Sequence, residues 1–185
     1  MLDGAPADAV ILSHPDWMTP LIDAGRVEAG DVLPLAGNAL VVVGRGPAID
    51  LEQLAEPRFG RIAIGDPDSV PAGLYAKQAL IAAGVLDAVA TKLVTTADVR
   101  AALRYAQTGE VEAAIIYATD AVELSTDGGS VLCVVDPTTH DPIVISAGVV
   151  DASPAGLRLL EVLQGDASTQ AFAEAGFRPA LRVRR

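Results

Sequence analysis

Short apolar runs alternate with amphipathic stretches along most of the chain. The apolar runs predict strands at residues 9–12, 39–43, 61–64, 111–117, 131–135 and 143–150. Stretches with apolar side chains at helical spacing, or with capping residues at their start, predict helices at residues 15–24, 50–55, 72–83, 99–107, 154–164 and 168–175. Strands and helices that alternate in this way favour an α/β fold with mostly parallel sheets.

Three short segments between residues 65 and 122 carry the most distinctive pattern. Helix starts are predicted at Pro71-Ala72-Gly73 and at Asp98-Val99-Arg100, and the apolar run at 111–117 ends in Tyr117. The first N–H groups of a helix have no partner inside the helix, and the helix dipole favours a negative charge beside them. Two helix starts and a phenol could therefore hold an oxyanion without any cationic side chain.

Each of these residues also has an ordinary structural interpretation. A tyrosine such as Tyr117 often buries its ring and leaves its hydroxyl in water. Ala72 and Val99 are common residue types in the first turn of a helix. An Asp98 side chain pointing at a bound anion would repel it, so Asp98 is expected to cap its own helix instead.

The charge balance narrows the possible partners. Thirteen basic and twenty-four acidic residues give a net charge of -11, which argues against nucleic acid as a ligand because that would demand a basic face. The same charge disfavours long-range attraction of an anion, so a bound anion would be held by local dipoles. The acidic surface itself is more simply explained as a solubility feature.

Other chemistry finds little support in the sequence. Cys133 is the only cysteine and lies in an apolar run, which indicates a buried structural thiol, and two histidines are too few and too scattered for a metal site. The chain has no nucleophile–base pattern and no phosphate-binding loop, so we expect no enzyme activity and no cofactor. It shows neither a signal peptide nor an apolar stretch of membrane-spanning length.

Several runs in chain order carry a likeness to one family. They are GAPADAVILSHPDWMTPLIDAG (4–25), LAGNALVVV (35–43), GDPDSVPAGLYA (65–76), DVRAAL (98–103), YATDA (117–121) and FAEAGF (172–177). In this order and spacing they resemble the periplasmic molybdate-binding proteins of ABC transporters, which are type II solute-binding proteins. The resemblance covers nearly the whole chain.

The resemblance implies two α/β lobes that close on an oxyanion between them. Carried onto this sequence, Ala72 and Val99 donate backbone N–H groups to the anion, and Tyr117 donates its hydroxyl. Arg100 is expected to act indirectly, by pairing with Asp66 or Asp120. Molybdate and tungstate present only acceptors, so neutral donors suffice, and selectivity rests on the size of the site and the placement of its donors.

The resemblance also implies how the chain divides. Residues 42–130 are expected to form a complete second lobe, and residues 1–41 with 131–185 an incomplete first lobe that lacks the family's N-terminal part. That part carries two serine loops, which supply further donors in the family. Strands left unpaired would expose edges and apolar surface, so we expect a homodimer or higher oligomer that completes the first lobe.

The function expected from the sequence is binding of molybdate or tungstate for an ABC importer. The expected partners are the oxyanion and the transporter permease, and the expected location is periplasmic or otherwise extracytoplasmic. The alternative is a truncated remnant, or a sensory or interaction domain of the same fold, with weak or no anion binding.

Overall fold

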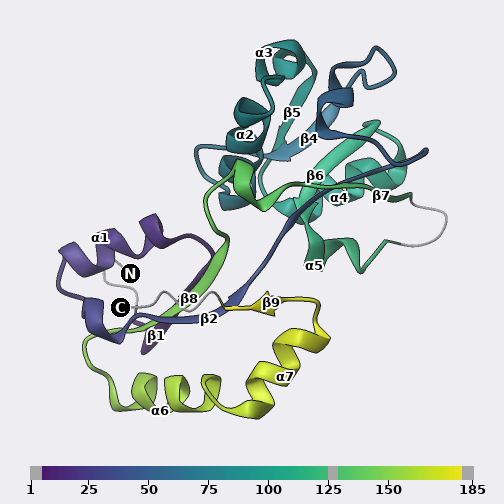
Figure 1. The fold of residues 1–185 in the computed structure, drawn as a ribbon. Coiled ribbons are helices and arrows are strands. Elements are labelled where there is room, and N and C mark those ends of the chain that lie inside the picture. Colours follow the sequence, from purple (N-terminus) through teal and green to yellow (C-terminus); the bar gives the residue numbers. More distant parts are fainter. Residues whose placement is uncertain (1–5, 125–128, 181–185) are drawn as a thin grey trace. The chain divides into compact units, whose positions relative to one another are not determined.

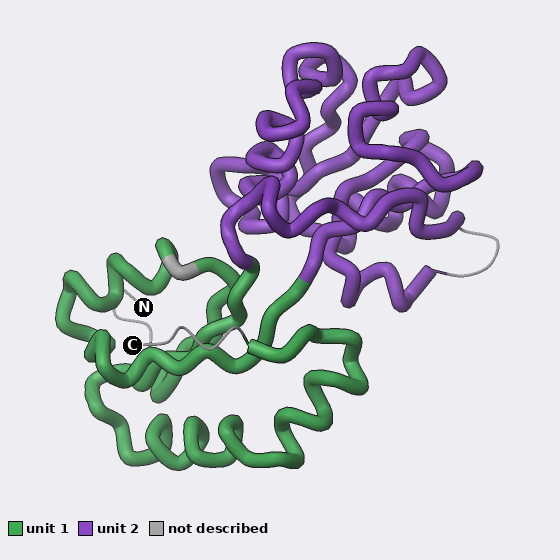
Figure 2. The backbone as a smooth tube through the Cα atoms, in the orientation of Figure 1, with its two compact units in different colours: residues 1–38, 143–185 green, residues 39–142 purple. Residues whose placement is uncertain are grey.

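The structure is a computed structural model that describes residues 6–124 and 129–180. The chain folds into two compact units, which Figure 2 shows in different colours. Unit 1 comprises residues 1–38 with 143–185, and unit 2 comprises residues 39–142. The chain thus enters unit 2 once, completes it, and returns to unit 1. This organisation makes unit 2 a continuous domain with its own core.

Unit 2 is built on a mixed sheet whose strand order is β5-β4-β6-β3-β7. Strand β4 runs parallel to both β5 and β6, whereas β3 runs antiparallel to β6 and β7. Apolar β-branched residues and alanines fill β3, β4 and β6, because both faces of these inner strands are covered, whereas the edge strands β5 and β7 are partly exposed. The strands are β3 (Leu40–Gly44), β4 (Ile62–Gly65), β5 (Leu93–Thr96), β6 (Ala113–Tyr117) and β7 (Ser130–Val134).

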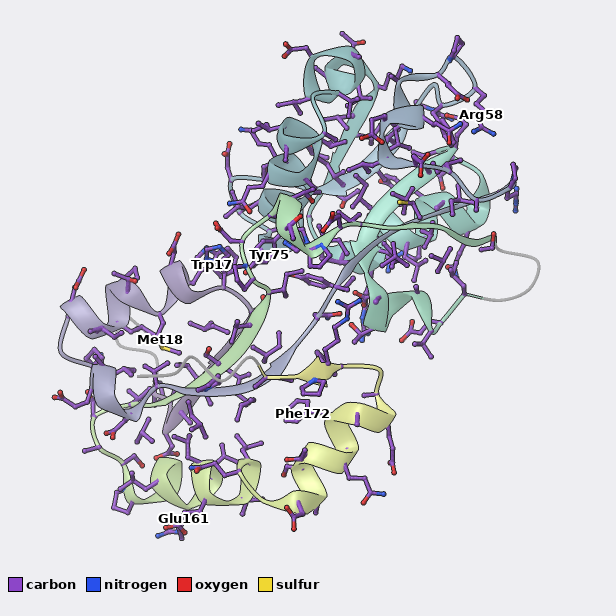
Figure 3. All side chains as sticks on the ribbon, in the orientation of Figure 1. Trp17, Met18, Arg58, Tyr75, Glu161 and Phe172 are labelled. Atoms are coloured by element: carbon purple, nitrogen blue, oxygen red, sulfur yellow. The ribbon has the colours of Figure 1, made fainter. Side chains whose placement is uncertain are left out.

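Helices cover the two faces of this sheet (Figure 1). Helix α4 (Val99–Thr108) packs on the face that includes Val41 and Ile116. Helix α2 (Pro71–Ala82) packs against β3, β4 and β6 through side chains that include the fully buried Tyr75, labelled in Figure 3. Two shorter helices, α3 (Leu86–Val89) and α5 (Ala118–Ala121), complete the unit.

Unit 1 is an antiparallel sheet of order β1-β8-β2-β9 with a helical layer on each face. One face packs Val10 with α1, and the other packs Val149 with α6. Alternation of side chains along each strand separates these two small cores. The elements are β1 (Ala9–Leu12), α1 (Thr19–Asp23), β2 (Leu33–Gly37), β8 (Val144–Val149), α6 (Pro154–Leu163), α7 (Asp166–Glu174) and β9 (Arg178–Pro179).

The boundaries between the two units differ from the lobe boundaries that the sequence analysis predicted. The sequence placed residues 131–185 together, but Val131–Val134 lie in β7 and pair with β3, so this strand belongs to unit 2. The run at 35–43 covers the end of β2 in unit 1 and most of β3 in unit 2, with Asn38 and Ala39 between the two strands. No helix in the described part of the chain is both long and apolar enough to cross a membrane.

Candidate functional site

The three segments singled out in the sequence meet at one edge of the sheet of unit 2. Helix α2 follows β4, helix α4 follows β5, and Tyr117 is the last residue of β6. Because β4 is parallel to β5 and to β6, the carboxyl ends of all three strands lie at the same edge. Ligands of open α/β sheets bind at this kind of edge, where successive connections leave the sheet in opposite directions.

The first turn of α2 lies directly against the end of β4. A Cβ added to Gly73 would sit 2.5 Å from the carbonyl carbon of Gly65 and 2.9 Å from that of Asp66, and closer still to the Gly65 oxygen. Only glycine allows this approach of helix to strand. The glycine in the Pro71-Ala72-Gly73 run therefore has a packing role at the sheet edge.

The loop from β4 into α2 is ordered by Asp66. Its carboxylate accepts hydrogen bonds from the Asp68 N–H (3.1 Å) and the Ser69 hydroxyl (3.0 Å), and its carbonyl accepts one from the Val70 N–H (2.7 Å). This is the self-bonded turn that aspartate commonly forms. The Asp66 carboxylate is therefore used within its own loop. The ion pairs among the described residues do not include Asp66 with Arg100, so that alternative of the predicted pairing is wrong.

The start of α2 leaves one N–H group without a partner. Pro71 has no N–H, and the N–H of Gly73 donates to the carbonyl of Val70 (2.9 Å). Among the described residues no acceptor receives the N–H of Ala72, although Ala72 is completely buried (0% exposed). Buried N–H groups are almost always bonded, so an unbonded one at a helix start is typical of a place that receives an acceptor.

The start of α4 offers two more such groups. As expected, Asp98 caps the helix, and its carboxylate accepts from the Ala101 N–H (2.7 Å). The N–H groups of Val99 and Arg100 precede the capped one, and neither has an acceptor within the described residues. The cap consumes the third donor of the helix and leaves the first two available.

A residue that the sequence analysis did not single out joins the two helix starts. Thr96, the last residue of β5, is buried, and its hydroxyl oxygen lies 3.1 Å from the carbonyl oxygen of Ile64 and 2.8 Å from that of Asp98. Its own carbonyl accepts from the Asp66 N–H (2.9 Å). No strand was predicted at β5, whose sequence LVTT is only four residues long, and Thr96 was given no role.

Tyr117 occupies the third position at this edge. It pairs with Leu40 of β3 as the last residue of β6 and precedes the short helix α5. The residue is half-buried, and its hydroxyl oxygen is buried. The interpretation of a ring buried with its hydroxyl in water is therefore wrong for this tyrosine.

Charged groups surround the start of α4. Burial raises the pKa of Asp120 above its usual value, the positive charge of Arg100 works in the opposite direction, and the charges of Glu123 and Asp98 add to the increase. No hydrogen bond or ion pair within the described residues joins Arg100 to Asp120, and the Arg100 side chain is exposed. Arg100 therefore acts on Asp120 through its field rather than by direct pairing.

Three other features of the described residues give no support to a different chemistry. No group of histidine, cysteine or acidic side chains in this part of the chain is arranged to hold a metal ion. Cys133 is half-buried in β7, and burial raises the pKa of its thiol, so the thiol stays protonated. A cavity of about 500 Å³ in unit 1 lies between β2 and α7, and its lining includes Leu35 and Phe172. Figure 3 labels Phe172. That lining is mainly apolar, with Gln164, Thr169 and Arg178 as its polar members.

Comparison with known proteins places the chain among solute-binding proteins of bacteria. The model of the family "Bacterial extracellular solute-binding protein" matches residues 1–178. An ABC-transporter substrate-binding lipoprotein of Bacillus subtilis, YvgL by name, is 35% identical over 181 residues, which are 94% of this chain and 68% of that protein. The molybdate-binding protein ModA of Escherichia coli is 30% identical over 184 residues, which are 94% of this chain and 71% of ModA.

The solved structures give the same fold. The periplasmic molybdate-binding protein of Azotobacter vinelandii superposes with a TM-score of 0.82 over 97% of this chain and 81% of that one, at 19% identity. At that identity the likeness establishes the fold, and it confirms the α/β class predicted from the sequence. The sheets are antiparallel in unit 1 and mixed in unit 2, rather than mostly parallel. The family match over almost the whole chain and the similarity to ModA support the same fold. The chain belongs to the family of bacterial extracellular solute-binding proteins.

Proposed function

We propose that this protein binds molybdate or tungstate for an ABC importer. The donors in unit 2 are the backbone N–H groups of Ala72 and Val99 and the hydroxyl of Tyr117. The observation that carries the proposal is the buried N–H of Ala72, which no acceptor of the described chain receives. The relative ModA of Escherichia coli, a molybdate-binding protein, supplies the class of anion.

The chemistry of the donors fits a tetrahedral dianion. Molybdate and tungstate present oxygen acceptors only, and backbone N–H groups and a phenol are donors that need no counter-charge of their own. Helices α2 and α4 are twelve and ten residues long, so each brings a full helix dipole to the sheet edge. Because the donors are neutral and fixed to the sheet, the spacing between them selects the size of the anion.

The surrounding charge predicts an unusual salt response. With a net charge of -11 on the chain, a dianion approaches against repulsion, and dissolved salt screens that repulsion. Affinity should therefore hold steady or rise as salt is added. A site built on lysine or arginine would weaken under the same conditions.

The remaining elements of the proposal follow from the importer role. The partner is the membrane-embedded permease of the transporter, and the location is periplasmic or otherwise extracytoplasmic. The protein binds and releases its anion without changing it, so neither catalysis nor a cofactor is required. Arg100 and Asp98 act indirectly, Arg100 by its field at the start of α4 and Asp98 by capping that helix.

A substitution at Val99 tests the donor role of the backbone itself. Val99 is the first residue of α4, where proline is well tolerated, and Asp98 before it is extended (φ -156°, ψ 166°), as a residue preceding proline should be. Val99→Pro therefore removes the N–H and leaves the helix start in place. Val99→Ala is the matched control, because it trims the side chain and keeps the N–H.

Titration calorimetry with sodium molybdate gives the measurement. The unmodified chain and Val99→Ala should bind one molybdate with similar affinity, and Val99→Pro should bind roughly 10- to 100-fold more weakly, the usual effect of losing a hydrogen bond to a charged group. Absence of heat from the unmodified chain would reject oxyanion binding and favour a sensory or interaction role. Equal affinity of the two variants would reject Val99 as a donor.

A further inference from the structure

We infer that Thr96 is a positioning residue that sets the spacing between the two helix starts, and so the size of oxyanion that unit 2 accepts. The inference rests on the proposed function for its ligand. Its structural basis is the hydroxyl of Thr96, which lies within hydrogen-bond distance of two carbonyl oxygens on different segments, Ile64 of β4 and Asp98 before α4.

The first joint connects β5 to the end of β4. Thr96 is 6% exposed, its hydroxyl lies 3.1 Å from the Ile64 oxygen, and its carbonyl accepts from the Asp66 N–H (2.9 Å). The two strands are therefore tied through both the side chain and the backbone of one residue, just where their regular pairing ends at Gly65. The end of β4 cannot move away from the end of β5 without breaking these contacts.

The second joint connects β5 to the start of α4. The Thr96 hydroxyl lies 2.8 Å from the carbonyl oxygen of Asp98, which also accepts from the Ala102 N–H (3.4 Å). Asp98 immediately precedes Val99, whose N–H is a proposed donor to the anion. The hydroxyl shares its one hydrogen between the Ile64 and Asp98 carbonyls, and so it fixes the N-cap of α4 against β4.

The third joint connects β4 to the start of α2. Gly73 lies so close to Gly65 that a methyl group cannot be placed between them. The position of Ala72, one residue earlier, is therefore set by β4, and the position of Val99 is set by Thr96, which also holds β4. The distance between the two N–H groups is determined through these joints, all of which lie within unit 2.

Spacing matters here because the donors are neutral. A site with fixed, uncharged donors distinguishes molybdate from the smaller sulfate by whether both helix starts can reach the anion together. If the Thr96 hydroxyl is removed, the start of α4 is no longer held at one distance from β4. The site then accommodates either anion with weaker and more similar affinity.

Variants of Thr96 and its neighbour separate positioning from simple stability. Thr96→Val replaces the hydroxyl by a methyl group of similar size, and Thr96→Ser keeps the hydroxyl. Thr95→Val is the matched control, since Thr95 is exposed and its side chain points to the opposite face of β5. Should Thr96→Val unfold, Thr96→Ala removes the same hydroxyl in a smaller side chain and is interpreted in the same way.

The experiment measures the affinity of the full chain for sodium molybdate and for sodium sulfate by calorimetry. Thr96→Val should weaken molybdate binding on the order of tenfold, the effect of one lost hydrogen bond, and should lower the molybdate-to-sulfate affinity ratio. Thr96→Ser and Thr95→Val should match the unmodified chain. An unchanged ratio in Thr96→Val, with molybdate still bound tightly, would overturn the inference and leave the proposed function standing.

A second measurement tests the positioning role of Thr96 without any anion. It still applies if the unmodified chain binds neither anion, which is the result that would reject the proposed function. In ¹⁵N-edited spectra of the ligand-free chain, Thr96→Val should shift the amide resonances of Val99 and Arg100, and Thr95→Val should leave them in place. Unmoved resonances in Thr96→Val would show that its hydroxyl does not position α4, and would reject the inference independently of any anion.

Discussion

Replacing Gly73 by alanine tests whether the close contact between α2 and β4 is real. The added Cβ would lie 2.5 Å from the Gly65 carbonyl carbon, whereas ordinary contacts begin at 3.4 Å, so helix and strand would have to separate by about 1 Å. The obstructing atoms belong to the backbone and cannot rotate away. Forcing extra carbon into a packed site costs about 1–3 kcal/mol.

Two effects of opposite sign determine how much Gly73→Ala changes the free energy of unfolding. Alanine is a better helix former than glycine by about 1 kcal/mol, which offsets part of the strain, although less so in the first turn. The net loss should be about 1–2 kcal/mol, or a fall in Tm of about 2–4 °C for each kcal/mol in a chain of this size. The free energy of anion binding should fall by more than the free energy of unfolding does, because the donor Ala72 moves with the displaced helical turn.

The assay is thermal and urea unfolding, with Gly60→Ala as the matched control in the same unit. A Cβ on Gly60 would meet only Glu112 Oε2, at an ordinary 3.5 Å, so this variant should be as stable as the unmodified chain or slightly more stable. If Gly73→Ala unfolds at the same temperature and urea concentration as Gly60→Ala, the close contact does not exist and the placement of Ala72 must be revised.

Three further predictions concern the frame around the site. Asp98→Ala should lower the free energy of unfolding by about 0.5–2 kcal/mol, because the Ala101 N–H loses its acceptor at the helix start. Asp98→Asn should keep most of the stability, because asparagine can also cap a helix, and urea unfolding of both variants measures the difference. Lys92→Met should cost about 1–3 kcal/mol, because the ammonium donates to three carbonyls at 2.8–3.3 Å, and equal urea midpoints would contradict it. Burial raises the pKa of Asp120, so the folded protein keeps this proton to higher pH than the unfolded chain, and the contribution of Asp120 to stability falls as pH rises above its ordinary pKa of 3.8. Urea unfolding measured over a series of pH values should show this decline in the unmodified chain and not in Asp120→Asn. A decline of the same size in the variant would refute the assignment to Asp120.

The helix starts were predictable because their chemistry is local. Proline at the first helical position, aspartate as a cap and a helical spacing of apolar residues are all readable along a single segment, and α2 and α4 begin at Pro71 and Val99 as their signals indicate. The resemblance added that both starts belong to one site. The parallel pairing of β4 with its neighbours then brought the segments to one sheet edge.

The missed features depend on contacts between distant segments. Strand β5 is only four residues long, so its pattern carries little signal, and its strand identity comes from pairing with β4. Thr96 was missed with it. The predicted boundary between the two lobes was misplaced at β7. The apolar run Val131–Val134 is compatible with a strand of either unit, and only its pairing with β3 assigns it to unit 2. The expected homodimer stays a prediction, since the structure contains one chain.

The central claim is that backbone N–H groups at two helix starts bind the oxyanion, and an NMR titration tests it most directly. Sodium molybdate added to the ¹⁵N-labelled chain should shift the amide resonances of Ala72 and Val99 together, with saturation at a single equivalent. Tungstate should produce the same pattern. Resonances of these two residues that stay fixed, whether or not other amides move, would contradict the account.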